Sequence, residues 1–486
     1  VNVKNTYFTD AINNYKGFLY AYNNYSMFGS NKLIKDIYGN VIYLHKDISG
    51  NPINPRYDLS GNDIKMPPGS VVTWGDSWSG GNSTGKDLTN VVSIYSTRQA
   101  FAALKSNGSV VTWGESSYGG SSPGSSISNG VVSIYSTYNA FAALKSDGSV
   151  VTWGGSWGGN SSAVNLSSGV VAIYSTLGAF AALKSDGSVV TWGGNNGDSG
   201  GNSSAVTSSL SSGVVSIYST YGAFAALKSN GSVVTWGVVS WADVGGNSSA
   251  VTSSLSSGVV AIYSTGFAFA ALKSDGKVVT WGHSDRGGNS SAVTSSLSSG
   301  VVAIYSTGFA FAALKSDGRV VTWGDNVYGG NSSAVTSSLS SGVVSIYSTP
   351  YSFAALKSDG SVVAWGSSTE GGSISVNAAA NLSTRGVVTI YATEGAFAAL
   401  KSNGSVVTWG SNDWGGNSAG ADLTSNIVSI SSSLGAFAAL KVIPPPAATY
   451  SANYTAYTGQ SLTITPTGVA NLTSASISPA VTGVSI

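Results

Sequence analysis

The chain has 486 residues, only 9% of them charged, with a formal net charge of +1 and no cysteine. This charge argues against the basic surface that nucleic-acid binding requires, and the absence of cysteine excludes disulfides and thiolate metal sites. Low charge with abundant Ser, Thr, Gly and Asn is typical of extracellular, cell-surface or virion-surface β proteins. No apolar run approaches the roughly eighteen residues of a membrane span.

Residues 1–66 differ from the rest in being rich in Lys, Asn, Asp and Tyr. A pattern of Asp, two residues and Gly-Asn recurs every 11 residues, at 36–40, 47–51 and 58–62. It predicts turns with short strands such as 41–44 between them. Calcium binding through the Asp and Asn oxygens is the alternative, although these loops lack the carboxylates of an EF-type site. We interpret this β-turn-rich segment as an anchor or assembly element.

Residues 67–441 repeat one unit nine times, best read in 214–237 as VVSIYST, AFAALKSNG and SVVTWG. A tryptophan ends each third segment at an interval of 39 to 45 residues, at Trp74, Trp113, Trp153, Trp192, Trp236, Trp281, Trp323, Trp365 and Trp409. A period near 40 with several short β-like runs is the signature of propeller blades. The three segments predict three strands, and the alternation at 249–255 predicts a fourth. The fold class is therefore all-β, a single large β-propeller of four-stranded blades.

Over residues 70–441 the repeat resembles the regulator of chromosome condensation family, which includes a secreted propeller-type inhibitor of β-lactamase. The family pattern has a strand ending in Ala-Gly, then His-Ser-Leu-Ala-Leu, an Asp-Gly turn and a strand ending in Trp-Gly. This chain has Thr220 and Ala223 where the family has Gly and His, and likewise Thr137 and Ala140. The resemblance implies a β-propeller, and it brings in nucleotide exchange or chromatin binding as a rival function.

The count of strands predicts how the ring closes. Nine strands of the first kind and nine of the second run from Val91 to Lys441, but the Trp strands start one unit early, at Val71–Trp74. Residues 70–75 should therefore supply the third strand of the ninth blade, which removes a free sheet edge. Seven blades with two repeats packed outside the ring would contradict this prediction.

Two side-chain series recur in every repeat. We interpret the Trp as core, because nine copies share one strand context, and an exposed stacking platform is the alternative. A lysine ends each second strand, at Lys105, Lys145, Lys184, Lys228, Lys273, Lys315, Lys357, Lys401 and Lys441. These lysines predict a solubilising ring at one face, and a surface for an anionic partner is the alternative.

The loops after the first and third strands vary, whereas the hairpin turns between strands two and three are nearly constant. In a meander both variable sets emerge on one face. This face is the candidate binding site for protein or glycan, through Trp78, Tyr118, Trp157, Trp241, Tyr328, Trp414, Arg98, Tyr138, Phe267 and Tyr351. Packing of loop against loop is the alternative role of these residues.

Nothing in the sequence predicts catalysis, a metal site or a cofactor. The two histidines, His45 and His283, lie in no nucleophile context, and His283 is expected to be a solvated loop residue. Acceptor triplets for N-glycosylation occur at Asn82, Asn160, Asn202, Asn247, Asn289 and Asn331.

The chain changes character again after residue 441. Residues 442–449 form a proline-rich linker, and residues 450–486 resemble the start of an immunoglobulin-like β domain, so the native protein is expected to continue. Together these features indicate a non-enzymatic structural or display propeller on the outside of a cell or a large virus particle. Its expected partners are proteins of that assembly or glycans. A lectin-like or inhibitor-like binding module is the main rival.

Overall fold

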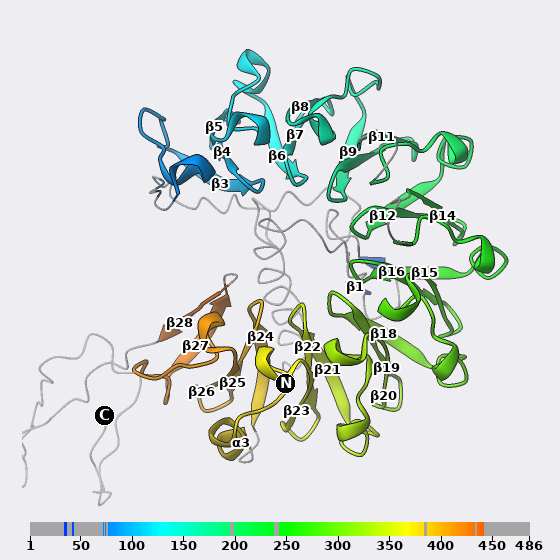
Figure 1. The fold of residues 1–486 in the computed structure, drawn as a ribbon, viewed down its shortest axis with the longest axis vertical. Coiled ribbons are helices and arrows are strands. Elements are labelled where there is room, and N and C mark those ends of the chain that lie inside the picture. Colours follow the sequence, from blue (N-terminus) through cyan, green and yellow to red (C-terminus); the bar gives the residue numbers. More distant parts are fainter. Residues whose placement is uncertain are drawn as a thin grey trace, which may run out of the picture.

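Nine antiparallel β-sheets follow one another along a single arc in the computed structural model (Figure 1). The structure describes residues 34–35, 41–42, 71, 73, 76–194, 199–237, 243–382, 386–432 and 435–441. Eight of the nine sheets have three strands, and the ninth has two described strands. We number them sheet 1 to sheet 9 in chain order. The chain is thus an all-β repeat protein with its sheets arranged as in a propeller.

Each sheet is a meander of consecutive strands, paired in the order first, second, third. The first strands, toward the centre of the arc, are β3 (Val91–Ser96), β6 (Val131–Ser136), β9 (Val170–Ser175), β12 (Val214–Ser219), β15 (Val259–Ser264), β18 (Val301–Ser306), β21 (Val343–Ser348), β24 (Val387–Ala392) and β27 (Ile427–Ser432). The second strands are β4 (Ala100–Lys105), β7 (Ala140–Lys145), β10 (Ala179–Lys184), β13 (Phe224–Lys228), β16 (Ala268–Lys273), β19 (Ala310–Lys315), β22 (Ser352–Lys357), β25 (Ala396–Lys401) and β28 (Phe437–Lys441). The third strands are β5 (Val110–Gly114), β8 (Val150–Gly154), β11 (Val189–Gly193), β14 (Val233–Trp236), β17 (Val278–Gly282), β20 (Val320–Gly324), β23 (Val362–Gly366) and β26 (Val406–Gly410).

The turn between second and third strands sets the register of each sheet. Between β7 and β8, the N–H of Lys145 donates to the carbonyl of Ser149, and the N–H of Gly148 donates back to the carbonyl of Lys145, both at 2.9 Å. Gly148 has φ +77°, which favours glycine, and the carboxylate of Asp147 accepts from the N–H of Ser149 at 2.9 Å. This is a type I turn followed by a left-handed glycine, and the repeated Ser-Asp/Asn-Gly sequence specifies it.

The predicted fourth strand is wrong. Residues 249–255 form a helical turn, η5 (Ser249–Val251), followed by hydrogen-bonded turns. The side chain of Asn247 accepts from the N–H of Ser249 at 2.9 Å, and the hydroxyl of Thr252 donates to the carbonyl of Ser249 at 3.1 Å. Asn, Ser and Thr side chains thereby satisfy the local backbone and compete with a sheet ladder.

Equivalent turns replace a fourth strand in the other sheets, at η3 (Gly124–Ile127), η4 (Ser204–Val206), η7 (Ser291–Val293), η9 (Ser333–Val335) and α3 (Val376–Leu382). In most sheets the outer segment is joined to the third strand by a backbone hydrogen bond, such as the one from the N–H of Val233 to the carbonyl of Leu255 at 2.9 Å. The blades are therefore three-stranded sheets with a turn-rich outer segment.

The repeated tryptophans are core residues, which confirms the prediction for the eight from Trp113 to Trp409. They are 1% to 5% exposed. In sheet 5, Trp281 stacks on Phe269 with ring centroids 5.2 Å apart, and its indole N–H donates to the carbonyl of Gly245 at 3.0 Å. Gly245 belongs to the loop that follows sheet 4. Each Trp therefore binds its own sheet to the loop of the sheet before it.

A backbone hydrogen bond also joins each hairpin turn to the next sheet. The N–H of Val131 in sheet 2 donates to the carbonyl of Gly108 in sheet 1 at 2.9 Å, and the same bond recurs at the seven following junctions. Consecutive first strands contact one another near the centre of the arc. The phenol of Tyr95 lies within hydrogen-bonding reach of Ser133 in the next first strand, and burial raises its pKa. Neighbouring sheets are therefore joined at three places: by the hairpin-turn hydrogen bond, by the indole bond of the repeated Trp, and by contacts between first strands at the centre of the arc.

The two ends of the arc expose side chains that are buried in the other repeats. In sheet 1, Ile94 is 42% exposed, against 2% for Ile134 in sheet 2. In sheet 9, Leu440 is 62% exposed, against 7% for Leu400 in sheet 8. The N–H of Val71 donates to the carbonyl of Leu88 at 3.3 Å, which is the bond that third strands make to their outer segments elsewhere.

The flanking parts of the chain are described only in small part. The short strands β1 (Ile34–Lys35) and β2 (Val41–Ile42) pair antiparallel, so the sequence correctly predicted a strand at residues 41–42. The predicted linker at 442–449 and the predicted β domain at 450–486 lie outside the described residues. Among the described helices, none has the length and apolar character needed to cross a membrane.

Candidate functional site

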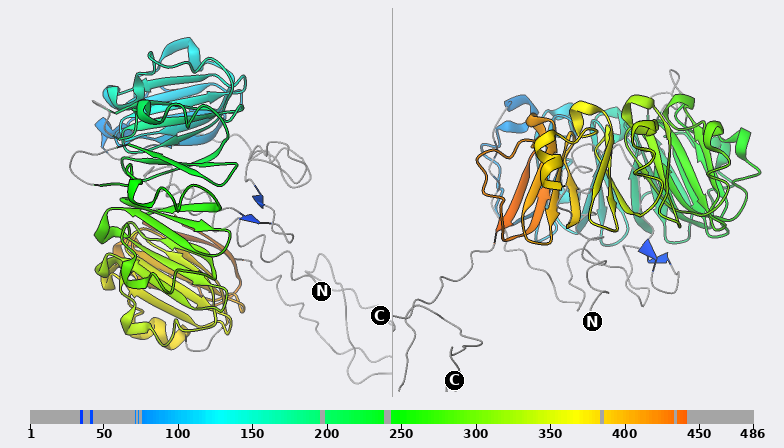
Figure 2. Two further views of the ribbon diagram at one scale, coloured as in Figure 1. Left: turned by 90° about the vertical axis from the view of Figure 1, so that its right-hand side faces the viewer. Right: turned by 90° about the horizontal axis from the view of Figure 1, so that it is seen from below.

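The variable loops gather on one side of the arc, which we call the loop face. It consists of the loops after the first and third strands, and the opposite hairpin face consists of the turns between second and third strands. Figure 2 shows short helical turns along the loop face. They are η1 (Ser77–Gly81), η2 (Ser116–Tyr118), α2 (Ser156–Gly159), η6 (Ser284–Arg286), η8 (Asn326–Gly330), η10 (Ser368–Glu370) and η11 (Asn412–Trp414).

A threonine in each of sheets 1 to 8 positions the two loops relative to one another. The hydroxyl of Thr137, which follows β6, donates to the carbonyl of Trp157 at 3.1 Å and accepts from the N–H of Ala140 at 3.2 Å. The equivalent bond from Thr393 to the carbonyl of Trp414 measures 2.7 Å. The loop aromatics are therefore attached to the rigid start of the second strand rather than to the loop alone.

A relay of backbone hydrogen bonds runs across the loop face from sheet to sheet. Each bond joins the first residue after the threonine to its neighbour in the next sheet, at 2.8 to 3.0 Å. The members are Arg98, Tyr138, Leu177, Tyr221, Gly266, Gly308 and Pro350, each donating to the next. The relay ends at Pro350 because proline has no N–H to donate to Glu394 of sheet 8.

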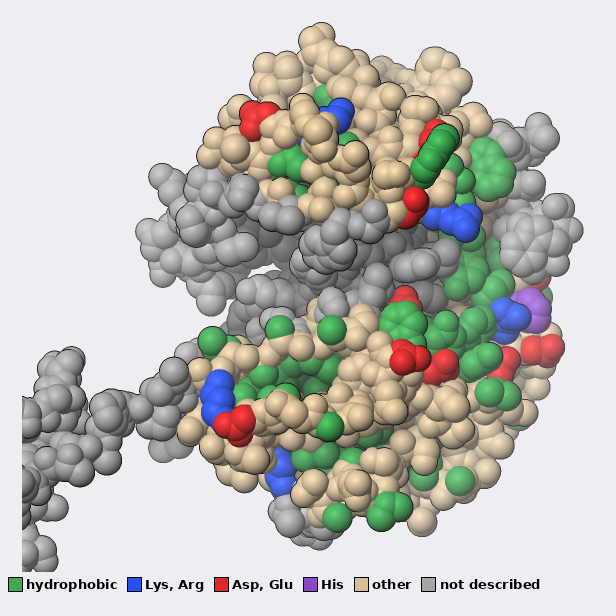
Figure 3. Space-filling model, turned by 60° about the vertical axis from the view of Figure 1, so that its left-hand side comes forward, with side chains coloured by type: hydrophobic (Ala, Val, Ile, Leu, Met, Phe, Trp, Pro, Cys, Tyr) green, Lys and Arg blue, Asp and Glu red, His purple; other side chains and the backbone are tan. Residues whose placement is uncertain are grey.

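An aromatic cluster occupies the loop face over sheets 4 to 7. Tyr221 meets Phe267 edge-on at 4.7 Å, Phe267 lies 5.9 Å from Phe309, and Tyr351 lies 6.3 Å from Phe309, all between ring centroids. Tyr328 completes the cluster at 4.7 Å from Phe309. Figure 3 shows hydrophobic side chains gathered on the molecule, with Asp and Glu side chains beside them.

Arg286 lies over this cluster. Its guanidinium carbon is 4.0 Å from the centroid of Phe267 and 5.0 Å from that of Phe309. Burial raises the pKa of Tyr221 to about 12, with a smaller contribution from the charge of Tyr351 and an opposing one from Arg286. The cluster is thus a partly buried aromatic strip with one cation stacked on it.

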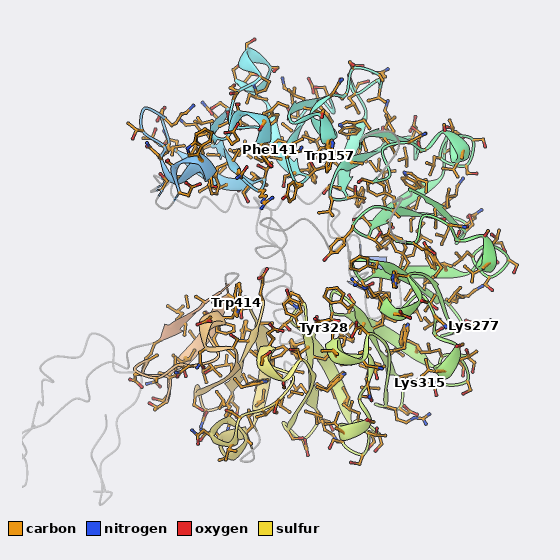
Figure 4. All side chains as sticks on the ribbon, in the orientation of Figure 1. Phe141, Trp157, Lys277, Lys315, Tyr328 and Trp414 are labelled. Atoms are coloured by element: carbon orange, nitrogen blue, oxygen red, sulfur yellow. The ribbon has the colours of Figure 1, made fainter. Side chains whose placement is uncertain are left out.

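The remaining candidate residues form smaller groups. Tyr118 lies 6.1 Å from Tyr138 between ring centroids, and Arg98 stacks over Tyr138 at 5.1 Å. Trp78 is 73% exposed and Trp157 is 42% exposed. In Figure 4, Tyr328 and Trp414 lie near the inner edge of the arc, whereas Lys277 and Lys315 lie toward its outer edge. Trp241 lies outside the described residues.

The structure therefore places Tyr328, Phe267 and Tyr351 in one cluster, and Arg98, Tyr118 and Tyr138 in a second. Phe309, Tyr221 and Arg286 were not among the site residues predicted from the sequence. Tyr221 and Phe309 lie in the variable pair of residues that follows the threonine, as Phe267 and Tyr351 do. Variation at this pair could therefore have identified them.

Comparison with known proteins places the repeat in a family. Residues 301–329 match the model of the Regulator of chromosome condensation (RCC1) repeat. Residues 301–318 of this match are identical to residues 259–276 of the preceding repeat. The chain carries a repeat of the regulator of chromosome condensation family at residues 301–329. A comparison with curated proteins finds no match.

Several solved structures match parts of this chain at low sequence identity. The ectodomain of the Physcomitrella patens receptor kinase CR4 is 16% identical over 57% of this chain and 72% of that chain, with a TM-score of 0.31. The Arabidopsis thaliana ACR4 ectodomain is 17% identical over 56% and 93%, with a TM-score of 0.31. Prp20p from Saccharomyces cerevisiae is 17% identical over 57% and 82%, with a TM-score of 0.30. TM-scores of this size do not establish a shared arrangement of sheets, so the family assignment rests on the repeat itself.

The RCC1-repeat pattern of this chain departs from the family at the threonine and at the alanine three residues later. In the structure, Thr220 is fully buried and donates to the carbonyl of Val244 at 2.7 Å, while Ala223 is fully buried at the start of the second strand. The two departures therefore build the threonine bond that fixes the loop face. Because Ala223 is fully buried, a side chain as large as histidine at this position would have to displace its neighbours.

The lysine ring has a role that neither interpretation from the sequence gave. The ammonium of Lys228 donates to the carbonyl of Ser209 at 2.7 Å, and that of Lys273 donates to the carbonyl of Ser254 at 2.8 Å. Lys315, Lys357 and Lys401 make equivalent bonds of 2.6 to 2.9 Å. These lysines satisfy backbone carbonyls of the outer turns, which is a capping role inside the repeat.

The candidate acceptor asparagines also have a local role. All six are exposed, and the side-chain oxygen of each accepts from the N–H two residues later, as in Asn160 with Ser162 at 3.0 Å. His283 was predicted to be a solvated loop residue, but the structure shows it only partly exposed. Its ring lies 6.2 Å from that of Phe267, and its Nδ1 is buried. His45 lies outside the described residues.

Proposed function

We propose that this chain is a non-enzymatic structural or display propeller on the outside of a cell or a large virus particle, whose loop face contacts other proteins. The observation that carries the proposal is where the sequence varies. Strands and hairpin turns are near copies, and five outer segments share the sequence Asn-Ser-Ser-Ala-Val, whereas the loop-face residues differ from repeat to repeat. A scaffold whose strands and turns repeat while one face varies is suited to presenting that face.

The way in which the chain leaves the repeats supports the same proposal. The last described strand, β28, ends at Lys441 on the hairpin face, where every second strand ends. Val71 corresponds to the first residue of a third strand and therefore also begins at the hairpin face. Both ends of the described repeats therefore lie at the hairpin face, opposite the loop face.

We also propose that the sheets close into a ring of nine blades. In eight sheets the third strand covers the second strand, but β28 lacks this neighbour among the described residues, and Leu440 is exposed. Residues 71–74 repeat the sequence of a third strand. The hydroxyls of Thr73 and Ser83 lie 2.8 Å apart, and those of the equivalent residues in sheet 2, Thr152 and Ser161, lie the same distance apart. Residues 71–74 would pair with β28, and the indole of Trp74 would donate to the carbonyl of Gly415.

A lectin-like or inhibitor-like binding module is the second candidate, and the aromatic cluster of Tyr221, Phe267, Phe309, Tyr328 and Tyr351 is the observation that favours it. Acceptor asparagines on exposed turns are compatible with an extracellular location, where glycosylation at these sites would be detected as added mass. Nucleotide exchange or chromatin binding has less support, because the described lysines are largely engaged with backbone carbonyls and the net charge is +1.

The experiment that tests the display function compares attachment with stability. Trp157→Ala and Trp414→Ala remove loop-face rings, and the full chain with either change should attach less to its native particle or cell surface in a co-sedimentation assay. The melting temperature should change by only a few degrees. Unchanged attachment together with a large drop in melting temperature would show that these side chains serve packing and that the loop face is not the contact site.

A further inference from the structure

Charge is distributed unequally between the two faces. Among the described residues, the loop face carries eight carboxylates and two guanidinium groups, a formal charge of −6. The carboxylates are Asp76, Glu115, Asp243, Asp285, Asp325, Glu370, Glu394 and Asp413, and the guanidinium groups are Arg98 and Arg286. The hairpin face, taken together with the ends of the outer segments that contact its lysines, carries twelve Lys or Arg and seven Asp, a formal charge of +5. A net charge near zero therefore conceals an acidic face opposite a basic one.

Among the described residues, no basic side chain forms an ion pair with a loop-face carboxylate. The three ion pairs between described residues, Lys105–Asp87, Arg319–Asp317 and Lys441–Asp422, all lie on the hairpin face. Some loop-face carboxylates also cap turns, as Asp76 accepts from the N–H of Ser79 at 2.9 Å, but they keep their charge in doing so. The acidic potential of this face is thus available to an external cation.

The aromatic rings of the same face already hold cations. Arg286 stacks over Phe267 and Phe309, and Arg98 stacks over Tyr138. A ring and a carboxylate together form a favourable site for a Lys or Arg side chain, because the ring contacts the cation and the carboxylate supplies the opposite charge. The two internal arginines show that a cation can stack on the rings of the loop face.

The loops of sheets 7 and 8 offer such a group without a cation of their own among the described residues. A Cβ placed on Gly395 would lie 2.8 Å from Cδ1 of Trp414 and 3.3 Å from Cγ of Glu370. Trp414 and Glu370 therefore flank Gly395, next to Glu394. Burial raises the pKa of the half-buried Glu394, which a neighbouring cation would oppose. The carbonyl of Glu394 also receives no relay bond, because Pro350 has no N–H.

We propose that the loop face docks a protein partner through Lys or Arg side chains, and that Trp414, Glu370 and Glu394 receive one of them. The inference deepens the proposed function and rests on it, because it names the chemistry of the partner that the displayed face contacts. Nucleic acid would be repelled by this face, and a neutral glycan would gain nothing from eight carboxylates. A protein surface rich in Lys or Arg matches both the rings and the charge.

The test measures binding of fluorescein-labelled nona-arginine to the full chain by fluorescence anisotropy at low ionic strength. Glu370→Gln with Glu394→Gln should weaken binding about tenfold, since two carboxylates next to one ring are lost. The matched control, Asp147→Asn with Asp359→Asn, removes the same charge from the hairpin face and should change the affinity less than about twofold. Trp414→Ala should weaken binding as well, and Trp414→Phe should largely restore it.

Equal weakening by both double variants, or no weakening by the loop-face variant, would overturn the inference. Equally tight binding of nona-glutamate or of a neutral oligosaccharide would also overturn it. This failure can be separated from failure of the display function. If the charge variants bind normally while Trp157→Ala still loses attachment to the particle, the display function stands and only the cationic chemistry of the partner is wrong.

Discussion

The indole N–H of Trp281 donates to the backbone carbonyl of Gly245, and these two residues belong to adjacent sheets. The same bond, at 2.9 to 3.0 Å, recurs from Trp113 to Trp409. The tryptophan is therefore both the core of one sheet and a link to the preceding loop, which explains why one residue type is repeated at this position.

Trp281→Ala should lower stability by about 3 to 5 kcal/mol, because it removes a buried ring and its stacking on Phe269. Trp281→Phe keeps an aromatic ring but leaves the carbonyl of Gly245 without its donor, and should cost about 1 to 3 kcal/mol. Calorimetric unfolding measures both. Trp78→Ala is the control, since Trp78 is exposed, and an equal effect at both positions would contradict the assignment of Trp281 to the core.

The hydrogen bonds from lysine ammonium groups to backbone carbonyls predict that removing a bound lysine lowers stability, whereas removing an exposed one does not. Lys228→Met keeps the apolar stem but removes the ammonium bound to the carbonyl of Ser209, and should cost about 1 kcal/mol or somewhat more. Lys277→Met removes the same charge from an exposed side chain on the same face and should leave the melting temperature unchanged. If both variants behave alike, the lysines act only through surface charge.

The relay across the loop face predicts the effect of a second proline. Leu177 occupies the position of Pro350, so the backbone there should accept proline, but Leu177→Pro removes the bond to the carbonyl of Tyr221. The expected loss is about 1 kcal/mol. Leu177→Ala keeps the N–H and serves as the control. Hydrogen exchange of the relay amides would also report the change, and full protection in the proline variant would contradict the relay.

The hairpin turns predict sensitivity to acid. Hydrogen bonds from the side chain and then the backbone of Ser149 lower the pKa of Asp147 below 3.8, and Ser188 does the same for Asp186. An acid whose pKa is lower in the folded state stabilises the fold above its ordinary pKa and loses this contribution as the pH falls through the lowered value. Asp147→Asn with Asp186→Asn should therefore leave stability at pH 7 nearly unchanged and reduce the loss of stability below pH 4. A loss in acid as steep as that of the wild type would contradict it.

The sequence was sufficient for the three strands of each sheet because their signals are local. Val-Val-Ser-Ile-Tyr-Ser and its partner strands are bounded by Ser-Asp-Gly turns, whose side-chain and glycine geometry specifies the hairpin. The fourth strand was predicted wrongly because Ser and Thr alternating with apolar residues imitate a strand. The deciding contacts there, such as Asn247 to Ser249, bond the segment to its own backbone.

The contacts between sheets could not be read from the sequence. The ammonium of Lys228 reaches a carbonyl 19 residues earlier, and the relay bonds join residues about 40 apart. Both depend on how adjacent sheets are stacked. The aromatic cluster was predicted in part, because variability identified Phe267, Tyr328 and Tyr351, whereas the stacking of Arg286 on Phe267 required their arrangement in space.

The central claim is that nine sheets form one closed ring in which residues 71–74 pair with β28. Register in the other sheets, such as Ala225 opposite Thr235, places Thr73 opposite Ala438. Because the chain has no cysteine, Thr73→Cys with Ala438→Cys gives a direct readout by mass and non-reducing electrophoresis after mild oxidation. The account predicts an intramolecular disulfide in the monomer, and no such disulfide in the out-of-register pair Thr73→Cys with Ala436→Cys. Two free thiols, or disulfide-linked dimers in place of the monomeric product, would contradict ring closure within one chain.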